Sequence, residues 1–496
     1  MTTNKPFYIT TAIDYVNGVP HIGHAFEKVH ADAIARYFRI QGYRVFFATG
    51  TDEHGAKIAR TAHQQKVDVR DFIDANAKVF MDMDKQLDIS YDFFIRTSDK
   101  QKHWGCAEKM WNALEQSKDL YKKTYTGFYC VGHEAFVTSK DLKDGVCEIH
   151  QTQPERIQEE NYFFKLSRYT DRIKQAITSG EMQILPKERE NEIMSFLNEG
   201  LVDVPFSRLK SSLQWGIPVP ADPDHTMYVW ADALTNYLSV LDWADSSELF
   251  SAFWPASVHI IGKDILRFHA TIWPGMLLSA GLALPKHILT HGFLSVDGAK
   301  MSKSVGNIVS PFEVIEEYSA EVVRYYLLSE IPFTRDGDFS KDKLKARYNG
   351  DLAFGLGNFI ARVTALGQKH ISGKTHKDPS QETQNMLSEH FNAYNEAMQQ
   401  FHINEAIAPI RTLMQFGDKK INNTRLWELP EKDNETFIQE MNDLAHIATT
   451  IAWMLLPIIP NTAQTILKRF GITDISKKQH WEFSFQSGEP LFAHKH

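Results

Sequence analysis

Two segments of the chain, residues 6–55 and 257–296, each alternate strand, helix and strand, and this repeated alternation restricts the possible folds most. In the first segment, "PFYITTAI" is followed by a turn, then by apolar residues at helical spacing, and then by "YRVFFATGTDEHG". In the second, "SVHIIGKDILRFHATIWPGMLL" and "HILTHGFLSV" repeat that order. Apolar strands that are joined through helices are typical of a parallel sheet. The sequence therefore predicts an α/β fold with a doubly wound, Rossmann-type parallel sheet in two halves.

Two regions differ in composition and periodicity from the strand–helix–strand segments: the stretch between the two halves, and the last part of the chain. Residues 118–222 are rich in aromatic and charged side chains with turn signals, and they hold the only close grouping of Cys and His in the sequence. From about residue 350 the apolar residues recur at helical spacing. We therefore predict a first half of the sheet domain (1–117), an inserted domain (118–222), a second half (223–315), a connecting segment (316–349) and an all-α helical bundle (350–496).

The composition is that of a globular protein without a membrane span. With 496 residues the chain can form several domains, and 43% of it is hydrophobic against 23% charged. The apolar run "IATTIAWMLLPIIP" is too short for a bilayer and contains Pro457. The N-terminus lacks the pattern of a signal peptide, and three cysteines do not make a disulfide framework, so we expect a cytoplasmic protein. A net charge of −8 does not favour indiscriminate nucleic-acid binding, but it allows a local basic face.

The stretch "VPHIGHAFEKVHADA" places His21 and His24 where the first strand leads into its helix. In an open parallel sheet, ligands lie at the carboxyl ends of the strands, where a helix N-terminus offers unpaired N–H groups to phosphate. Imidazole N–H groups add directed donors, and Gly23 leaves room for a close ligand. A metal site is the weaker interpretation, because no third Cys, Asp or Glu stands at matching spacing.

A second basic motif, "GAKMSKSVGN", follows a strand of the second half. Lys300 and Lys303 flank small hydroxyl residues in a loop bounded by glycines. Such a loop can carry two ammonium groups onto a polyphosphate. Taken alone, it would equally be a solvated basic loop.

The two motifs together, on opposite halves of one split sheet, resemble the signatures of class I aminoacyl-tRNA synthetases, and within that class the chain is similar to the methionyl-tRNA synthetases. The similarity runs along the whole sequence through "FATGTDEHG", "EENYFFKLS", "WGIPVP", "YVWADAL", "IGKDILRFHA" and "HGFLSVDGAKMSKSVGN". A short form is implied, since nothing resembling an appended dimerisation domain follows the bundle. We therefore expect a monomer.

The resemblance implies a two-step reaction. L-Methionine and ATP give methionyl-adenylate and pyrophosphate, and the methionyl group then passes to the 3′-terminal adenosine of initiator and elongator tRNA(Met). By similarity, His21 and His24 stabilise the reacting phosphate, while Lys300 and Lys303 hold the pyrophosphate. Mg2+ accompanies the ATP. The ATP-binding residues implied are His21, Gly23, His24, Glu27, Gly262, Asp264, Lys300, Ser302 and Lys303.

Methionine recognition needs an apolar, aromatic-lined pocket for the thioether and a carboxylate for the ammonium group. The resemblance assigns the ammonium to Asp52. Around the side chain it places Ala12, Ile13, Tyr15, Trp230, Ala233, Leu234, Tyr237, Ile265 and His269. From the residues alone, Trp230 and Tyr237 would be read as core residues and Asp52 as a turn residue.

The predicted insertion contains Cys130, His133, Cys147 and His150, which form two C-x2-H pairs. Two such pairs can close a tetrahedral Zn2+ site. The family often has zinc here, usually with more cysteines, so His133 replaces the commoner thiolate with another permitted ligand. We expect one structural Zn2+, with a knuckle that has lost its metal as the alternative.

Three residues of the predicted bundle match the family's anticodon readers. Asn358 and Arg362 are four residues apart and share one helix face, and Trp427 lies in "NNTRLWEL". Single-stranded RNA bases stack on aromatic or guanidinium planes, and amides bind their edges. Leu426 is a departure, because a proline commonly precedes this tryptophan in the family. Taken alone, the three would be ordinary surface and core residues.

Other readings fit less of the sequence. Synthetases for leucine, isoleucine or valine carry a much larger editing insertion. The cysteine enzyme needs a thiolate-rich zinc site inside its amino-acid pocket, and small nucleotidylyltransferases leave the helical bundle unexplained. A synthetase-derived RNA-binding protein without catalysis is the alternative from another class, and the intact His21, His24, Asp52, Lys300 and Lys303 argue against it.

Overall fold

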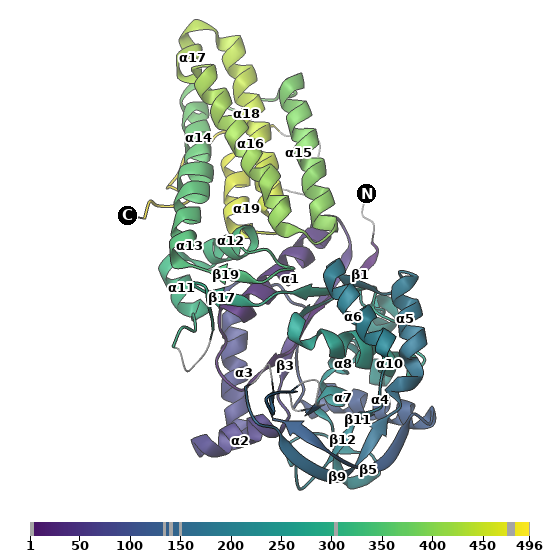
Figure 1. Ribbon diagram of the computed structural model, residues 1–496. Coiled ribbons are helices and arrows are strands. Elements are labelled where there is room, and N and C mark those ends of the chain that lie inside the picture. Colours follow the sequence, from purple (N-terminus) through teal and green to yellow (C-terminus); the bar gives the residue numbers. More distant parts are fainter. Residues whose placement is uncertain are drawn as a thin grey trace. The chain divides into compact units, whose positions relative to one another are not determined.

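The computed structural model describes residues 4–131, 135–137, 142–147, 151–301, 306–473 and 482–495. The chain divides into two compact units, whose elements are labelled in Figure 1. The sheet unit consists of Met1–Ala31, Gln41–Lys85 and Ser90–Phe293, and the helical unit of Asp32–Ile40, Gln86–Ile89 and Leu294–His496.

A parallel sheet forms the centre of the sheet unit. Its strands lie in the order β10-β16-β15-β1-β3-β2, and β4 also pairs with β3. All these pairs are parallel, which confirms the predicted fold class. The strands are β1 (Pro6–Thr11), β2 (Asp14–Tyr15), β3 (Arg44–Asp52), β4 (Phe93–Arg96), β10 (Gln183–Leu185), β15 (Val258–Gly262) and β16 (His287–His291).

The two halves of the sequence meet where β1 pairs with β15, with Ile9 opposite Val258 and Thr11 opposite Ile260. From β1 the chain continues through a helix to β3 on one side, and from β15 it continues to β16 on the other. The connections therefore diverge at the β1–β15 pair. In a doubly wound sheet this is the point at which a crevice opens at the carboxyl ends of the strands.

Helices of the sheet unit follow the strands along the chain, as the predicted alternation requires (Figure 1). Buried apolar residues of α1, including Phe26 and Val29, recur at the spacing expected for one helix face. The helices outside the predicted insertion are α1 (Ile22–Ile40), α2 (Ala56–Gln65), α3 (Val69–Gln86), α4 (Gly105–Gln116), α7 (Val229–Ala233), α8 (Asn236–Ser239), α9 (Glu248–Phe253) and α10 (Trp273–Ser279).

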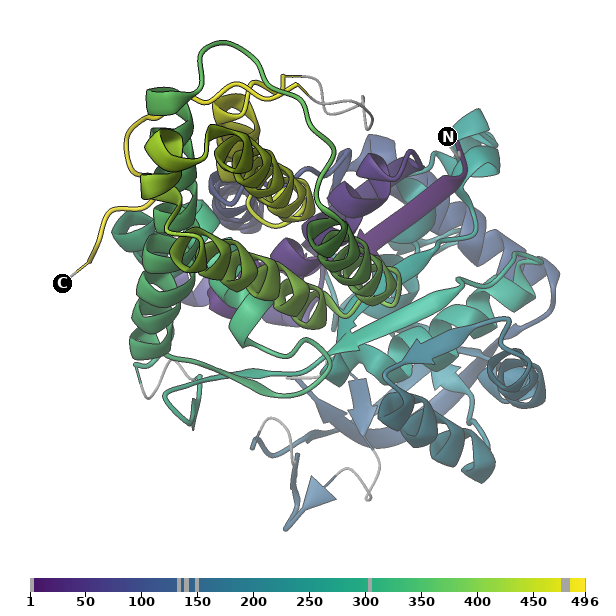
Figure 2. The same cartoon turned by 90° about the horizontal axis from the view of Figure 1, so that it is seen from above.

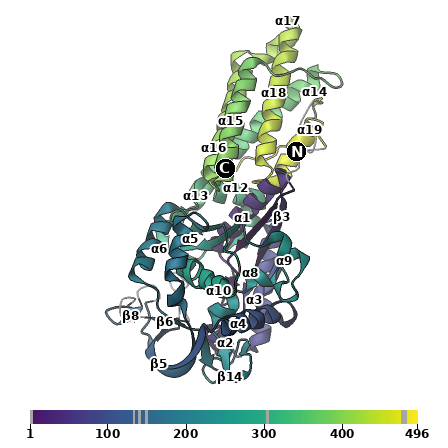
Figure 3. The same ribbon diagram turned by 90° about the vertical axis from the view of Figure 1, so that its right-hand side faces the viewer.

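The region predicted as an insertion is built around a long antiparallel pair, β5 (Leu120–Cys130) with β9 (Glu155–Phe164). Figure 3 labels β5, β6 and β8, and β6 pairs with β5 in antiparallel orientation. One strand inside this range, β10, joins the main parallel sheet by pairing with β16, which the sequence pattern did not predict. The remaining elements of the region are β6 (Ala135–Val137), β7 (Leu142–Lys143), β8 (Val146–Cys147), α5 (Thr170–Thr178), α6 (Lys187–Glu199), β11 (Val204–Pro205), β12 (Ser207–Leu209), β13 (Pro218–Val219) and β14 (Asp222–Met227).

The helical unit begins with a small sheet and continues as a bundle, whose long helices are seen from above in Figure 2. Helices α15, α16 and α18 pack on one another, and α14 packs on α16 and α18. The elements are β17 (Leu294–Val296), β18 (Ala299–Lys300), α11 (Pro311–Tyr318), α12 (Ala320–Glu330), β19 (Gly337–Phe339), α13 (Lys341–Arg347), a π-helical turn (Tyr348–Gly357), α14 (Asn358–His370), α15 (Gln381–Gln399), α16 (Ile403–Asn423), α17 (Leu429–Lys432), α18 (Asn434–Leu455) and α19 (Pro460–Arg469).

A buried ion pair between Arg324 and Asp32 stabilises the helical unit. Arg324 of α12 is fully buried, forms an ion pair with Asp32 at 2.6 Å, and donates to the carbonyl oxygens of Leu87, Pro457 and Ile458. A guanidinium group has donors for all of these acceptors, which is why so large a polar group can be buried. Within the part of the chain that the structure describes, no helix combines the length and apolarity that a bilayer crossing needs.

Candidate functional site

Several polar residues that the sequence predicts for the functional site lie at the carboxyl ends of the central strands of the sheet unit. The N–H of Ala12 donates to Ile260 O at 2.9 Å, so the chain leaves β1 alongside β15. Gly262 ends β15, Asp52 ends β3, and α1 starts at Ile22, directly after His21. These residues come from two segments of the sequence and lie along one edge of one sheet.

The rings of His21 and His24 stack, with centroids 3.9 Å apart and an angle of 29° between their planes. The backbone N–H of His21 donates to Nδ1 of His24 at 3.0 Å, and the N–H of Gly23 donates to Nδ1 of His21 at 3.1 Å. A ring nitrogen that accepts a hydrogen bond carries no proton, so both rings hold their proton on Nε2. Burial holds the pKa of His24 well below its usual range, and the nearby charge of Lys28 acts in the same direction. The pair therefore presents two neutral Nε2–H donors.

A network of buried charges lies behind these imidazoles. Nζ of Lys28 donates to Glu27 Oε1 at 2.8 Å, to Asp14 Oδ1 at 3.2 Å and to the carbonyl oxygen of Ala12 at 3.0 Å. The other carboxylate oxygen of Glu27 lies 3.0 Å from Nε2 of His291. Lys28 is fully buried, so these contacts offset the cost of removing its charge from water. The network joins the start of α1 to the end of β1.

His291 differs from His21 and His24 in its protonation. Its Nδ1 faces the carbonyl oxygen of Gly292 at 2.8 Å, and its Nε2 faces Glu27. Because both nitrogens face acceptors, both carry protons. Burial alone would lower the pKa of His291, but the hydrogen bond and charge of Glu27 raise it above the usual value. The strand-end region therefore combines a cationic imidazole with two neutral ones.

The end of β15 is closely packed. A Cβ atom on Gly262 would lie 2.6 Å from Oδ1 of Asp264 and 3.6 Å from the ring of His291. Burial raises the pKa of the Asp264 carboxyl above its usual value, against the opposing effect of the His291 charge. Gly262 has an ordinary φ of −70°, so a Cβ atom there would displace the Asp264 carboxylate without straining the backbone.

Aromatic residues surround the predicted methionine pocket. The Tyr237 hydroxyl lies 2.7 Å from Nε2 of His269, and Nδ1 of His269 lies 3.0 Å from the Ile265 carbonyl oxygen. His269 therefore donates from Nδ1 and accepts the tyrosine proton at Nε2. Burial lowers the pKa of His269 to about 4, so the ring is neutral at pH 7. Trp230 lies flat on Phe268, with ring centroids 3.9 Å apart and planes 8° apart.

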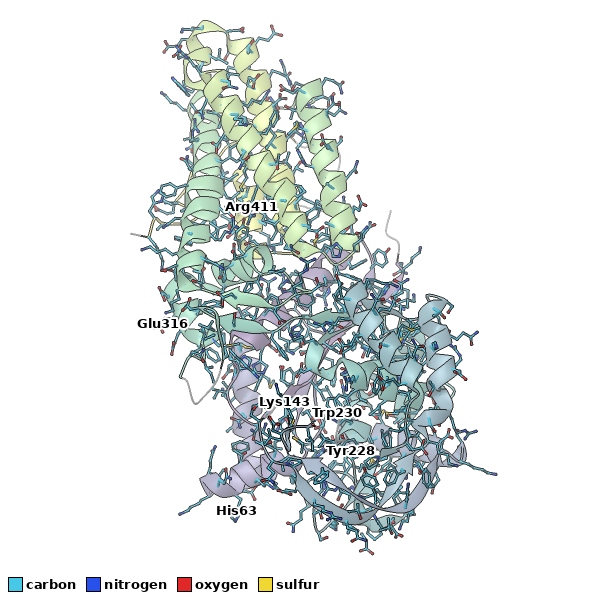
Figure 4. All side chains as sticks on the ribbon, in the orientation of Figure 1. His63, Lys143, Tyr228, Trp230, Glu316 and Arg411 are labelled. Atoms are coloured by element: carbon cyan, nitrogen blue, oxygen red, sulfur yellow. The ribbon has the colours of Figure 1, made fainter. Side chains whose placement is uncertain are left out.

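Trp230 follows Tyr228 closely in the sheet unit, and both are labelled in Figure 4. Its indole Nε1 is buried and has no hydrogen-bond partner among the described residues. Ala12, Trp230 and Ile265 pack against the apolar cluster that contains Leu234 and Tyr237. The structure thus brings these five predicted residues onto one apolar cluster.

Four other residues predicted for the methionine pocket are not among the five that share this apolar cluster. Asp52 and Tyr15 lie opposite each other on the paired strands β3 and β2, and Nζ of Lys57 lies 5.8 Å from the centre of the Tyr15 ring. Ala233 is buried in α7, whereas Ile13 packs against a separate cluster with Tyr8. Ile13 therefore shares less of its surroundings with the other predicted pocket residues.

The predicted lysine loop belongs to the helical unit. Lys300 is exposed at the end of β18, and its carbonyl oxygen accepts from Nδ2 of Asn307 at 3.1 Å. A turn at Asp297 and Gly298, both with positive φ, connects β17 to β18. Ser302 and Lys303 lie outside the described residues.

Half of the predicted zinc set is described. Cys130 ends β5 and Cys147 ends β8, and both side chains are buried in one small cluster with Val137. The N–H of Gln151 donates to the Cys147 carbonyl oxygen at 2.8 Å. His133 and His150 lie outside the described residues, and the described residues by themselves contain no group of three or more His, Cys, Asp or Glu able to hold a metal.

The predicted anticodon residues all lie in the helical unit. Arg362 of α14 donates to Asp418 at 3.0 Å and to Asn422 at 2.6 Å, both on α16. Asn358 is exposed one turn earlier on α14. After α16, Arg425 has a positive φ, Leu426 is fully buried, and Trp427 is 51% exposed. Leu426 therefore anchors the turn that presents the tryptophan ring.

Several residues of the region at the strand ends were missed from the sequence. Lys28 lies within a helix and has no distinguishing spacing, so no signal pointed to it. His291 directly follows the apolar run of β16, and a polar residue at a strand end was the available signal. Phe268 lies in an apolar stretch with no distinguishing spacing, and only its stacking on Trp230 connects it to the predicted pocket residues.

Comparisons with known proteins agree with this arrangement. The family model described as tRNA synthetases class I (M) matches residues 7–140 and 134–364. The methionine--tRNA ligase of Thermotoga maritima is 39% identical over 504 residues, covering 98% of this chain and 80% of that protein. The one from Rhizobium meliloti is 39% identical over 508 residues, covering 100% and 98%. Mycobacterium tuberculosis methionyl-tRNA synthetase in complex with methionyl-adenylate aligns with a TM-score of 0.94 and 36% identity, covering 98% of this chain and 99% of that one.

The close packing at Gly262 leads to a prediction. Gly262→Ala forces Asp264 to move, and we expect affinity for ATP to fall about 10- to 100-fold, the scale for losing one hydrogen bond to a charged group. Isothermal titration calorimetry measures the affinity. Gly350→Ala is the control, because a Cβ atom there meets nothing within 4 Å. Unchanged ATP affinity in Gly262→Ala would contradict this role of the glycine.

Proposed function

The chain belongs to the methionyl-tRNA synthetases, a class I family, and from this premise we propose how its residues perform the reaction. The protein is a methionine–tRNA ligase: it activates L-methionine with ATP to methionyl-adenylate and pyrophosphate, then transfers the methionyl group to tRNA(Met). The observation that carries the proposal is the pair of neutral imidazoles at the start of α1, which present Nε2–H donors at the edge of the sheet.

In the activation step the methionine carboxylate displaces pyrophosphate at the α-phosphorus of ATP. Negative charge accumulates on phosphate oxygens in the transition state, so fixed donors and cations are what the reaction requires. We assign the Nε2–H groups of His21 and His24 to the reacting phosphate. The Glu27–His291 pair and Asp264 support the nucleotide from the same edge. Lys300 and Lys303 neutralise the pyrophosphate, and Mg2+ enters with ATP.

For methionine we assign the ammonium group to Asp52 and the thioether to the aromatic pocket. His269 accepts from Tyr237 and is neutral, so it places no charge beside the apolar side chain. Trp230, stacked on Phe268, supplies a flat apolar wall. Sulfur makes favourable contacts with aromatic rings, which favours methionine over an aliphatic chain of similar length.

Zinc, where bound, would be held by Cys130 and Cys147 together with His133 and His150. The burial of both thiols in one cluster fits a shared site. Such an ion would hold the predicted insertion in shape and would have no chemical role in the reaction.

For tRNA selection we assign the anticodon to the face formed by Asn358, Arg362 and Trp427. Asp418 and Asn422 hold the guanidinium group in one orientation, so that its plane and remaining donors can meet a base. An exposed indole beside a buried anchor suits the stacking of an unpaired base. We propose that both initiator and elongator tRNA(Met) are substrates, charged on the 3′-terminal adenosine by a monomer in the cytoplasm.

Amino-acid-dependent ATP–pyrophosphate exchange across the twenty amino acids tests the function, and methionine alone should give strong exchange. We expect Lys303→Ala to slow methionine activation by roughly 10²- to 10³-fold, the scale for losing one charge-stabilising group. Lys345→Ala, an exposed lysine of α13, is the control. An exchange rate in Lys303→Ala equal to that of the control would remove Lys303 from the mechanism.

The anticodon assignment predicts that Trp427→Ala separates the two steps. Charging of tRNA(Met) should fall roughly 10- to 100-fold, since stacking of one base contributes about 1–3 kcal/mol, while methionine activation stays within twofold. Trp427→Phe keeps an aromatic plane and should lose less. Aminoacylation and pyrophosphate exchange are measured on the same preparations, and equal losses in both assays would contradict the assignment.

The zinc assignment predicts one zinc per chain in protein purified without chelators. Cys147→Ser should reduce the bound zinc to well below one and lower the melting temperature, because metal binding contributes to folding. Elemental analysis and thermal unfolding measure the two effects. Cys106→Ser, a buried cysteine outside the proposed set, should retain the metal. Wild-type protein with little zinc would refute the assignment.

A further inference from the structure

A buried carboxylate in the sheet unit connects two elements of the proposed methionine pocket, and this role goes beyond the assignments above. Asp232 lies in α7 with 1% of its surface exposed. Its Oδ2 is 2.6 Å from Nδ1 of His54, and its Oδ1 is 2.6 Å from Nε2 of His103. Each carboxylate oxygen thus meets one imidazole nitrogen, and both imidazoles are buried as well.

The three side chains come from separate parts of the sequence. His54 follows Asp52 by two residues, just beyond the end of β3. Asp232 lies between Trp230 and Ala233 in the five-residue helix α7. His103 continues the network, since its Nδ1 is 2.9 Å from the hydroxyl of Ser239 in α8. The Asp232 carboxylate therefore connects the segment that contains Asp52, the proposed ammonium ligand, with helix α7, which contains Trp230.

The protonation of the network follows from its geometry. Burial alone would raise the pKa of Asp232, but the charge of His54 and the hydrogen bonds from both imidazoles lower it to about 2. An ionised carboxylate only accepts, so His54 donates from Nδ1 and His103 donates from Nε2. Such charge-assisted bonds are short and directional, which suits a positioning role.

Glu53, the residue after Asp52, makes hydrogen bonds that do not involve α7. Glu53 is buried and accepts from Thr51 at 2.7 Å and from Arg96 at 2.6 Å, and its carbonyl oxygen accepts from Nε1 of Trp215 at 2.6 Å. These bonds fix the backbone on either side of Asp52. A helix as short as α7 has few hydrogen bonds of its own, so tertiary contacts determine its position.

We propose that Asp232 is a positioning residue for methionine, which acts through His54 and His103 to hold Asp52 and Trp230 at the separation that the amino acid requires. The inference rests on the proposed function of the pocket. Asp52 and Trp230 are both assigned to methionine, so loss of the link between them should affect use of methionine more than use of ATP. A displacement of about 1 Å can cost about 10²-fold in rate.

The test compares the Michaelis constants for methionine and ATP in pyrophosphate exchange. Asp232→Ala removes both acceptors, and we expect KM for methionine to rise about 10- to 100-fold, while KM for ATP changes less than about threefold. The control is Asp119→Ala. Asp119 is equally buried and binds Arg168, Tyr169 and Ser279 elsewhere in the sheet unit. If Asp119→Ala raises KM for methionine as much as Asp232→Ala does, the positioning role is refuted.

A double-mutant cycle with His54→Leu separates positioning from general destabilisation. If Asp232 acts through His54, the double variant should be no worse than Asp232→Ala by more than about threefold, because the two changes break the same link. If the increases in KM for methionine from the two single substitutions multiply in the double variant, the proposal is overturned. Wild-type protein without methionine-dependent exchange would refute the proposed function itself, whereas normal wild-type exchange with an unchanged KM in Asp232→Ala would refute only this inference.

Should Asp232→Ala fail to fold, substitutions at His54 test the same link. His54→Asn places an amide N–H near the position of Nδ1, whereas His54→Leu removes the donor. We expect KM for methionine to rise about tenfold or more in His54→Leu and distinctly less in His54→Asn. Equal KM values in the two folded variants would overturn the proposal.

Discussion

The pairing of β1 with β15 is the contact on which the sheet unit depends. It joins two segments far apart in the sequence and creates the point at which the strand connections diverge. Without it, the start of α1 and the ends of β15 and β16 would not share one edge.

Protonation at the strand ends is set by hydrogen bonds that the backbone imposes. His21 and His24 accept from main-chain N–H groups and are neutral donors at Nε2, whereas His291 faces two acceptors and is cationic. Three histidines with the same ordinary pKa thus differ in charge within one region. A site that must stabilise phosphate during displacement gains both directed donors and positive charge from this arrangement.

The sequence predicted the parallel sheet and the bundle well, because both follow from local periodicity. His21 was singled out because it lies where a strand leads into a helix, whereas Gly262 and Asp264 were proposed from the resemblance to the family. Lys28, His291 and the Asp232 network were not found. Their importance comes from partners as far as 264 residues away along the chain, as for Glu27 and His291, and no local pattern records such a partner. The strand β10 was missed for the same reason, since three residues acquire their role only by pairing with β16.

By itself, the sequence indicated the alternation of strands and helices in the sheet, the fold class and the family, because apolar periodicity and short motifs are local properties of the chain. Tertiary structure decided which ring nitrogens carry protons, which charges are buried in pairs and that Asp232 meets both His54 and His103. The physical reason is that hydrogen-bond direction and desolvation depend on the atoms within a few ångströms of a group. In this protein the folding of distant segments brings those atoms together.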